Sequence, residues 1–174
     1  MKRAFVFACL FLLTAPAFAE APRDTAGPIT NQAQRDAIAT RVRAGESCTR
    51  CDLFQIDLSY QSLAGRDFSG SRIRQSDLSL ATADRARFHG ANMSLANLFG
   101  MRASSADFTD ANLDHATLVG AYLGGARLSG AVLTGANLSG AELDQAVGIS
   151  QAQLNAACGD ASTTLPSGLT IPHC

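Results

Sequence analysis

Residues 106–145 read ADFTD ANLDH ATLVG AYLGG ARLSG AVLTG ANLSG AELDQ, eight groups of five in which Ala comes first and Leu or Phe comes third. Neither regular element explains this spacing, because a helix repeats every 3.6 residues and a strand every two. A chain that turns one corner in every five residues does explain it. The large third residue then points inward, and Ala fits where the backbone is crowded. The stretch therefore predicts a solenoid built from five-residue units.

The same spacing extends over most of the chain. Every fifth residue from Leu53 to Leu143 is apolar at nineteen successive positions, and only Ala83 and Ala103 among them are small. Ala stands two residues before the large one in twelve of these units, and Asp or Asn often stands between the two. Such regularity predicts a continuous solenoid over about residues 51–146.

The first units depart from this pattern at the position of the small residue. Four polar residues replace Ala there: Gln61, Arg66, Ser71 and Ser76. A charged side chain in the interior is costly. Two interpretations are open: the Arg66 side chain escapes at the end of the solenoid, or the local register is distorted.

Residues twenty apart share properties, which predicts four units in each coil. One interior column would contain Phe68, Phe88, Phe108 and Leu128. A second column would collect both small exceptions, as Leu63, Ala83, Ala103, Leu123 and Leu143. Met101 adds volume beside Ala103, as a close-packed core requires. An outer column would alternate in charge as Asp67, Arg87, Asp107 and Arg127, with neighbouring coils roughly 4.8 Å apart.

This pattern resembles the pentapeptide-repeat family, whose consensus is A-(D/N)-L-x-x. The chain spells the consensus at residues 91–93, 96–98, 106–108, 111–113 and 136–138. The resemblance implies an all-β fold, a right-handed, four-sided parallel β-helix with four units per coil. Some relatives are dimeric, acidic rods that bind DNA topoisomerase and protect it from inhibitors.

The N-terminal residues are typical of an export signal. Lys2 and Arg3 precede an apolar stretch, and residues 17–19 read AFA, an A-x-A cleavage site,. The apolar stretch is shorter than the roughly 20 residues that span a bilayer. We expect a signal peptide over residues 1–19, a mature chain from about Glu20 with a flexible leader over 20–29, a periplasmic or secreted location, and no transmembrane segment after removal of the signal.

The two ends of the solenoid need covers, because exposed strand edges invite aggregation. Residues 30–50 contain a predicted helix, with Thr30 or Asn31 as its N-cap and Gly45 as its stop, followed by a cysteine motif,. Residues 147–174 contain a second predicted helix from Ser150 through Ala157, followed by an ordered tail. The sequence therefore predicts a short α-helical cap at each end.

Four cysteines remain after removal of the signal, and they lie in pairs at the two ends. An even number in an exported chain favours disulfides over metal ligands. The solenoid is too long for a bond between its ends, so we predict the pairs Cys48–Cys51 and Cys158–Cys174,. The spacing of Cys48 and Cys51 also matches that of thiol–disulfide oxidoreductases, although such motifs normally open a helix after a strand.

No catalytic, cofactor or metal site is predicted. His89 and His115 occupy outward positions in different coils, and His173, Cys174 and Cys158 lack a fourth ligand for a closed zinc site,. The Asp residues before the large position are expected to cap turns or face water. The protein is therefore expected not to be an enzyme.

One surface feature departs from the polar pattern. Phe99 and Val119 share an outward column, and Tyr60 and Leu80 share the column beside it. A contiguous apolar patch suggests a partner surface, although loops of the chain could also cover it. If this patch is a binding surface, self-association to a homodimer is its simplest function.

Three functions follow as hypotheses. The first is an exported scaffold that binds an unknown protein or envelope component. The second is a redox protein that uses Cys48 and Cys51. The third is a nucleic-acid mimic that binds topoisomerase, which requires a strongly acidic surface, whereas Asp and Arg alternate here. Without the signal the chain has twelve basic residues against fifteen acidic ones, so no nucleic-acid partner is expected,.

Overall fold

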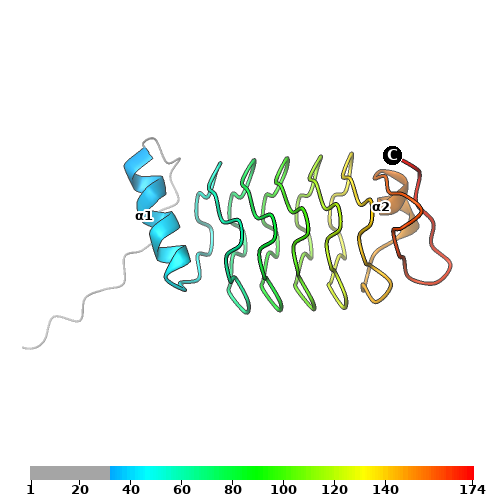
Figure 1. Cartoon of the computed structure of the whole chain (residues 1–174), viewed down its shortest axis with the longest axis horizontal. Coiled ribbons are helices and arrows are strands. Elements are labelled where there is room, and N and C mark those ends of the chain that lie inside the picture. The colour runs from blue at the N-terminus through cyan, green and yellow to red at the C-terminus, as the bar shows by residue number, and fades with distance from the viewer. Residues whose placement is uncertain (1–31) are drawn as a thin grey trace, which may run out of the picture.

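A computed structural model describes residues 32–174. The predicted signal peptide (1–19), the leader (20–29) and the candidate helix caps Thr30 and Asn31 lie outside the described residues. A stack of coils forms the body of the described chain, with helix α1 at one end and helix α2 at the other (Figure 1).

The coils repeat every twenty residues, as the sequence predicts. Parallel bridges join residues twenty apart in an unbroken series from Asp52↔Arg72 to Arg127↔Val147. Each side of a coil contributes one bridge residue rather than an extended strand. We number the sides by their interior residues: side 1 contains Leu53, side 2 Leu58, side 3 Leu63 and side 4 Phe68. The corner that follows each side takes its number, and the result is a four-sided parallel β-helix.

The interior holds the residues that the five-residue spacing selects. All nineteen positions from Leu53 to Leu143 are buried. The rings of Phe68 and Phe88 stack with centroids 5.4 Å apart, and those of Phe88 and Phe108 with centroids 5.1 Å apart. The predicted single column of Phe side chains is therefore confirmed.

The corners are β-turns stabilised by the Asp and Asn side chains. At one of them, Ala111 N donates to Phe108 O over 3.0 Å, and Thr109 N donates to Asp107 Oδ1 over 3.1 Å. The second corner residue has a positive φ at every corner from Arg50 to Gly140, as at Leu80 (57°) and Gly120 (65°). The prediction that these carboxylates and amides cap turns is confirmed.

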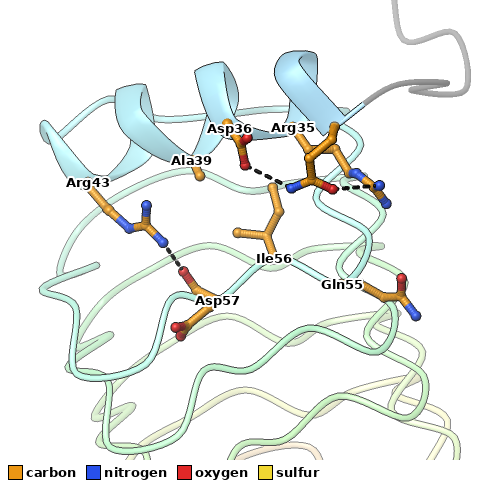
Figure 2. Close-up of a pocket in the computed structure, with 8 residues that line it drawn as sticks. Arg35, Asp36, Ala39, Arg43, Gln55, Ile56 and Asp57 are labelled. Atoms are coloured by element: carbon orange, nitrogen blue, oxygen red, sulfur yellow. Dashed lines mark hydrogen bonds between the residues drawn. The ribbon is translucent and has the colours of Figure 1, made fainter.

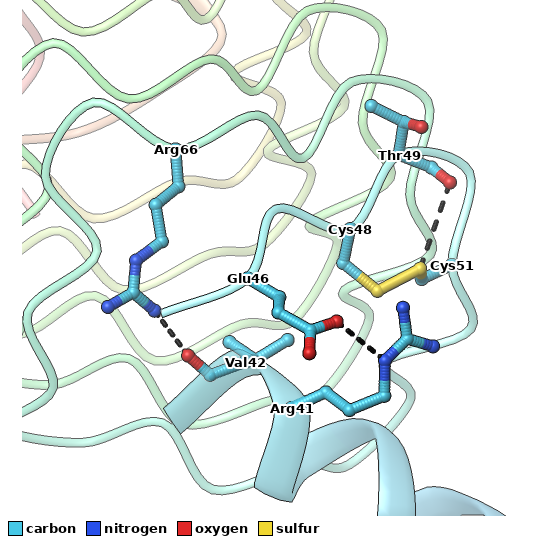
Figure 3. A network of polar contacts seen from close by, with 7 residues as sticks. All are labelled: Arg41, Val42, Glu46, Cys48, Thr49, Cys51 and Arg66. Carbon is cyan, nitrogen blue, oxygen red and sulfur yellow. Dashed lines mark hydrogen bonds and ion pairs between the residues drawn. A yellow bond between two sulfur atoms is a disulfide. The ribbon is translucent and has the colours of Figure 1, made fainter. Parts of the chain in front are cut away.

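Helix α1 (Gln32–Arg43) lies against the first coil, where Val42 is fully buried. The Arg66 side chain leaves the interior there, and its Nη1 donates to the backbone oxygen of Val42 at the end of the helix (Figure 3). The bridges on either side of Arg66 keep the twenty-residue register. Of the two interpretations of Arg66, escape at the end of the solenoid is therefore the one that the structure shows.

The unit geometry begins earlier than the predicted boundary at residue 51. Cys48 N donates to Asp67 O over 2.8 Å, in the same way that Phe68 N donates to Arg87 O. Cys48 thus occupies the large interior position of side 4, and Cys51 occupies the small position of side 1. The sequence already indicated this earlier start, since Cys48 lies five residues before Leu53.

The C-terminal end is closed by a helix and by the tail. Ser150 N-caps α2 (Gln151–Asn155) in a capping box with Gln153, and Leu154 is fully buried,. The helix ends before the expected Ala157, because Cys158 N donates to Ala136 O on the last coil and not to Leu154 O in the helix. In the tail, Cys174 N donates to Gly159 O, so a terminal segment pairs with the last coil on side 2.

Candidate functional site

The four predicted surface residues lie along corner 2, which we call the apolar edge: Tyr60, Leu80, Phe99 and Val119. Backbone hydrogen bonds join this corner from coil to coil, from Tyr60 N to Ser79 O, from Leu80 N to Phe99 O and from Gly100 N to Val119 O, each over 2.8–2.9 Å. The four residues therefore form one continuous strip along the rod.

The members of the apolar edge differ in exposure. Tyr60 is 74% exposed, Phe99 48% and Leu80 42%, whereas Val119 is partly buried. Leu80 leans onto the next coil, because its Cδ2 lies 2.7 Å from where a Cβ on Gly100 would be. The lack of a side chain at Gly100 lets Leu80 lie flat beside Phe99, so the strip is centred on Leu80 and Phe99.

Other exposed apolar side chains lie outside this strip. Leu95 projects from corner 1 and is 44% exposed. Tyr122 lies on side 3, but its hydroxyl approaches Gly124 at corner 3, away from the apolar edge. Sequence reasoning did not single out either residue, although both stand at outward positions of the repeat.

Charged residues on the sides of the coil form ion pairs from coil to coil. Arg87 lies 3.5 Å from Asp67, and Arg127 lies 2.6 Å from Asp107, so the predicted alternating column forms pairs. Two further pairs, Arg72–Asp52 and Arg102–Asp84, join other coils. Neighbouring opposite charges thus neutralise each other along the rod.

The cysteines pair as predicted within the described residues. The sulfur atoms lie at bonding distance, 1.98 Å for Cys48–Cys51 and 2.07 Å for Cys158–Cys174. Cys48 and Cys51 are 2% and 4% exposed. Reactive cysteines are usually partly exposed, so the burial of this pair favours a structural role at the start of the solenoid interior.

The three histidines lie in three different parts of the described chain. His89 and His115 are exposed, and His115 Nδ1 lies 3.0 Å from Asp114 Oδ1. His173 is exposed and bridges to Gly159 in the tail. Among residues 32–174, no group of three His, Cys, Asp or Glu side chains is arranged to hold a metal ion. No helix in this part of the chain is long and apolar enough to cross a membrane.

A pocket of about 250 Å³ lies between α1 and the first coil, and sequence reasoning missed it (Figure 2). One face of the helix lines it with Gln32, Arg35, Asp36, Ala39 and Arg43. Ile56 supplies the opposite wall from the small position of side 2, where Ala is usual. Ile56, a large residue at a position where Ala is usual, was the available sign of the pocket in the sequence. Its contact with the helix depends on the fold.

Asp57, at the rim of this pocket, turns its carboxylate toward corner 2. Its Oδ1 accepts hydrogen bonds from Ser59 Oγ (2.7 Å) and Ser59 N (2.9 Å). These two bonds, the hydroxyl bond first, lower the pKa of Asp57. The backbone oxygen of Asp57 accepts from Arg43 Nη2 over 2.8 Å.

The family model for pentapeptide repeats matches residues 62–100 and 111–147, with eight copies. No curated protein matches the chain.

Three solved structures of pentapeptide repeat proteins are similar to the chain. One from the Arabidopsis thaliana thylakoid lumen is 33% identical, with 51% of this chain and 65% of that one covered and a TM-score of 0.45. HetL, involved in heterocyst differentiation regulation in Nostoc sp. strain PCC 7120, is 26% identical over 72% of this chain and 61% of its own, with a TM-score of 0.38. Rfr23 from the cyanobacterium Cyanothece 51142 is 25% identical, with coverages of 72% and 95% and a TM-score of 0.49.

The chain spans 65% and 61% of the lengths of the first two of these proteins. Pentapeptide-repeat proteins form right-handed, four-sided β-helices. The nineteen buried positions and the twenty-residue bridges agree with the matched repeats, and the chain belongs to the pentapeptide-repeat family.

Proposed function

We propose that this protein is an exported, non-enzymatic scaffold that binds a protein partner through the apolar edge. The observation that carries the proposal is the strip formed by Tyr60, Leu80 and Phe99, whose side chains are 74%, 42% and 48% exposed and adjoin one another from coil to coil. Contiguous apolar surface on a soluble protein is typical of an interaction site. Members of this family are in general structural or binding proteins, which supports the same function.

The scaffold is suited to present such a strip rigidly. Each coil is held to the next by backbone hydrogen bonds along its sides and at most of its corners. A surface that is already ordered loses little conformational entropy on binding. Phe99, an aromatic residue of the kind enriched at interaction hot spots, would serve as the anchor of the contact.

Export is the second component of the proposal. It rests on the charged and apolar N-terminal residues followed by AFA at 17–19, and on the pairing of all four remaining cysteines,. A periplasmic or secreted partner, or a component of the cell envelope, follows from that location.

The double variant Leu80→Ser with Phe99→Ser tests the binding edge. We expect it to fold normally and to lose a partner that the unaltered protein retains from an extract of the exported compartment. Leu95→Ser is the matched control, because Leu95 has the same turn position, a similar φ of 59° and a similar exposed fraction of 44%. Retention of the same partner by the double variant would contradict the proposal.

Self-association is tested on the same proteins by sedimentation. If a second copy is the partner, the unaltered protein and the Leu95→Ser variant sediment as dimers and the double variant as a monomer. If all three sediment as dimers, the contact lies elsewhere on the surface, and if all three sediment as monomers, a second copy is not the partner.

A further inference from the structure

A groove of about 590 Å³ lies along corner 4 near the start of the rod. Three successive coils line it with their two corner residues, which are Thr49 and Arg50, Ser69 and Gly70, and His89 and Gly90. Corner 4 lies diagonally opposite corner 2 in a four-sided coil. The groove is therefore separate from the apolar edge, and what it binds does not depend on the proposed function.

Arg50 brings an unpaired positive charge into this groove. Its Cγ lies 3.3 Å from where a Cβ on Gly70 would be, so the side chain runs along the rod over the next coil. Among residues 32–174, the Arg50 side chain has no ion pair at 4 Å or less and no hydrogen bond. The five N–H donors of its guanidinium are therefore available to a ligand.

The backbone N–H of His89 is a second donor in the groove. At many corners the equivalent N–H donates to an Asp or Asn side chain two residues earlier, as Thr109 N does to Asp107 Oδ1 over 3.1 Å. Before His89 that position holds Arg87, which has no acceptor. Within the described part of the chain, His89 N has no hydrogen-bond partner.

Corner 3 shows how a carboxylate binds to an N–H in this position. There Ser104 N donates to Asp84 Oδ1 over 3.1 Å, and Arg102 Nη2 donates to Asp84 Oδ2 over 2.5 Å. Asp84 belongs to the preceding coil, twenty residues before Ser104. The residue twenty before His89 is Ser69, so corner 4 lacks the carboxylate that corner 3 takes from its own chain.

The carboxylates near the groove are engaged or directed elsewhere. Asp67 Oδ1 accepts from Ser69 N over 2.9 Å, and Asp67 Oδ2 lies 3.5 Å from Arg87 Nε. Burial acts to raise the pKa of Asp67, but hydrogen bonds from Ser69 and the charges of Arg87 and His89 lower it. Asp110, at the same corner of the next coil, leans onto the coil beyond it. Arg87 and the His89 ring thus act on Asp67, which leaves the backbone N–H and the Arg50 guanidinium for a ligand.

We propose that the corner 4 groove binds a carboxylate group, with one oxygen on the N–H of His89 and the other on the guanidinium of Arg50. The ligand would lie as the Asp84 carboxylate lies at corner 3, with Arg50 in the role of Arg102. A carboxylate on a guanidinium forms charge-assisted hydrogen bonds, which are roughly twice as strong as neutral ones. Small organic acids and the acidic side chains of a bound protein both carry this group.

Titration of the purified protein with acetate, followed through its amide signals in nuclear magnetic resonance, tests the site. We expect a saturable shift of the His89 amide signal and little change at Ser104, whose N–H is already bound to Asp84. No saturable shift at His89, or an equal shift at Ser104, overturns the proposal. Tighter binding of inorganic phosphate at the same ionic strength overturns the choice of a carboxylate.

A second titration distinguishes the two sources of the carboxylate. Glutamic acid that is blocked at its amino and α-carboxyl groups presents its side chain as a protein does. Binding as tight as that of acetate supports acidic proteins as ligands. A shift with acetate alone supports small organic acids and excludes acidic side chains.

Arg50→Gln tests the cationic contact. We expect it to weaken acetate binding by about fivefold. Arg85→Gln is the matched control, because Arg85 is also exposed at the second corner position, with a φ of 59° against 54° at Arg50. Equal weakening in both variants would show that only the net charge of the protein matters, and unchanged binding in Arg50→Gln would refute the contact.

Ser69→Asp tests the comparison between the two corners. The new carboxylate would stand to His89 N as Asp84 stands to Ser104 N, so it should shift the His89 amide signal and abolish acetate binding. Thr134→Asp, which adds the same charge at an exposed first corner position on corner 1, should bind acetate as the unaltered protein does. Equal thermal stability of the variants shows that the fold is retained. Undiminished acetate binding by Ser69→Asp would place the ligand elsewhere and overturn the proposal.

Discussion

Ala83 shows how closely a single residue is fitted to its position in the coil. It stands where most units have Leu, and it is fully buried. Phe88 occupies the next side of the same coil and is also fully buried. The interior therefore has a fixed volume in each coil, which a large residue on one side and a small one on the next fill together.

Enlarging this residue should strain the coil. Ala83→Leu is expected to reduce the free energy of unfolding by about 1–3 kcal/mol, because the extra atoms force neighbouring side chains and backbone apart. Denaturant unfolding measures the change. Ala64→Leu, at an exposed corner position of the preceding coil, is the control and should change stability by less than about 0.5 kcal/mol. A neutral Ala83→Leu would show that the interior has unfilled space.

The second residue of each corner is not restricted to Gly, although its backbone is left-handed. The second corner residue requires a left-handed backbone, which Gly adopts freely and other residues adopt at a cost. Ten described residues other than Gly have a positive φ at this position, among them Leu80 and Leu95. The sequence does not reveal this geometry at Leu80, because Leu rarely adopts it. The ladder of coils imposes the conformation.

At the scale of one structural element, ion pairs connect each coil with the next. Asp107 accepts from Arg127 Nη2 over 2.6 Å and from Thr109 N over 3.1 Å. Burial acts to raise the pKa of Asp107, but these hydrogen bonds and the charge of Arg127 lower it to about 2. The ionised carboxylate is therefore the form that stabilises the fold.

The low pKa gives an expected dependence of stability on pH. In the unfolded chain the carboxyl has an ordinary pKa of about 3.9, so its stabilisation is present above that pH and is lost as the pH falls through about 2,. Asp107→Asn should cost at most about 1 kcal/mol at neutral pH, since Arg127 is 60% exposed,. Its difference from the unaltered protein should shrink between about pH 4 and pH 2 in urea unfolding.

The matched control for this change is Asp110→Asn, which alters an exposed carboxyl at the next corner that has no ion pair among the described residues. A difference between Asp107→Asn and the unaltered protein that stays constant down to pH 2 would argue against a functional ion pair with Arg127.

The sequence was sufficient to predict the coils, because their pattern is local. It was not sufficient to predict features formed where segments distant in the sequence come into contact. Leu at every fifth position determines which residues are interior, and Phe68, Phe88 and Phe108 reveal the coil length because they recur twenty residues apart. The pocket beside α1 requires the angle of a helix against the first coil, which no repeat encodes. Val119 was placed on the correct edge, but its partial burial depends on neighbouring side chains.

At the scale of the whole molecule, the disulfides at the two ends of the rod have different structural settings. At the start, the disulfide Cys48–Cys51 occupies interior positions of adjacent sides, at the same end of the rod as α1 (Figure 3). At the finish, the disulfide Cys158–Cys174 holds a tail segment that pairs with Gly159. The second bond closes a much longer loop, with a sequence separation of 16 against 3.

Loss of the C-terminal disulfide should therefore weaken the molecule at that end. Cys158→Ser with Cys174→Ser is expected to lower the free energy of unfolding by about 3 kcal/mol, because the unfolded chain regains the entropy of the open loop. Hydrogen exchange should quicken at Gly159 N, which donates to Pro172 O in the tail, and should stay slow at Phe88 N in the middle of the rod. Continued protection of Gly159 N would show that the tail pairs without its covalent link.

The twenty-residue coil also restricts how such a gene can change in length. Duplication of twenty residues adds one whole coil and leaves every later side facing the same direction as before. Insertion of a single group of five instead turns all that follows by a quarter of a revolution, which would carry Phe99 away from Tyr60 while the interior stayed filled. Lineages that keep a binding strip should therefore gain or lose whole coils. Shorter insertions should persist only at the two ends of the rod.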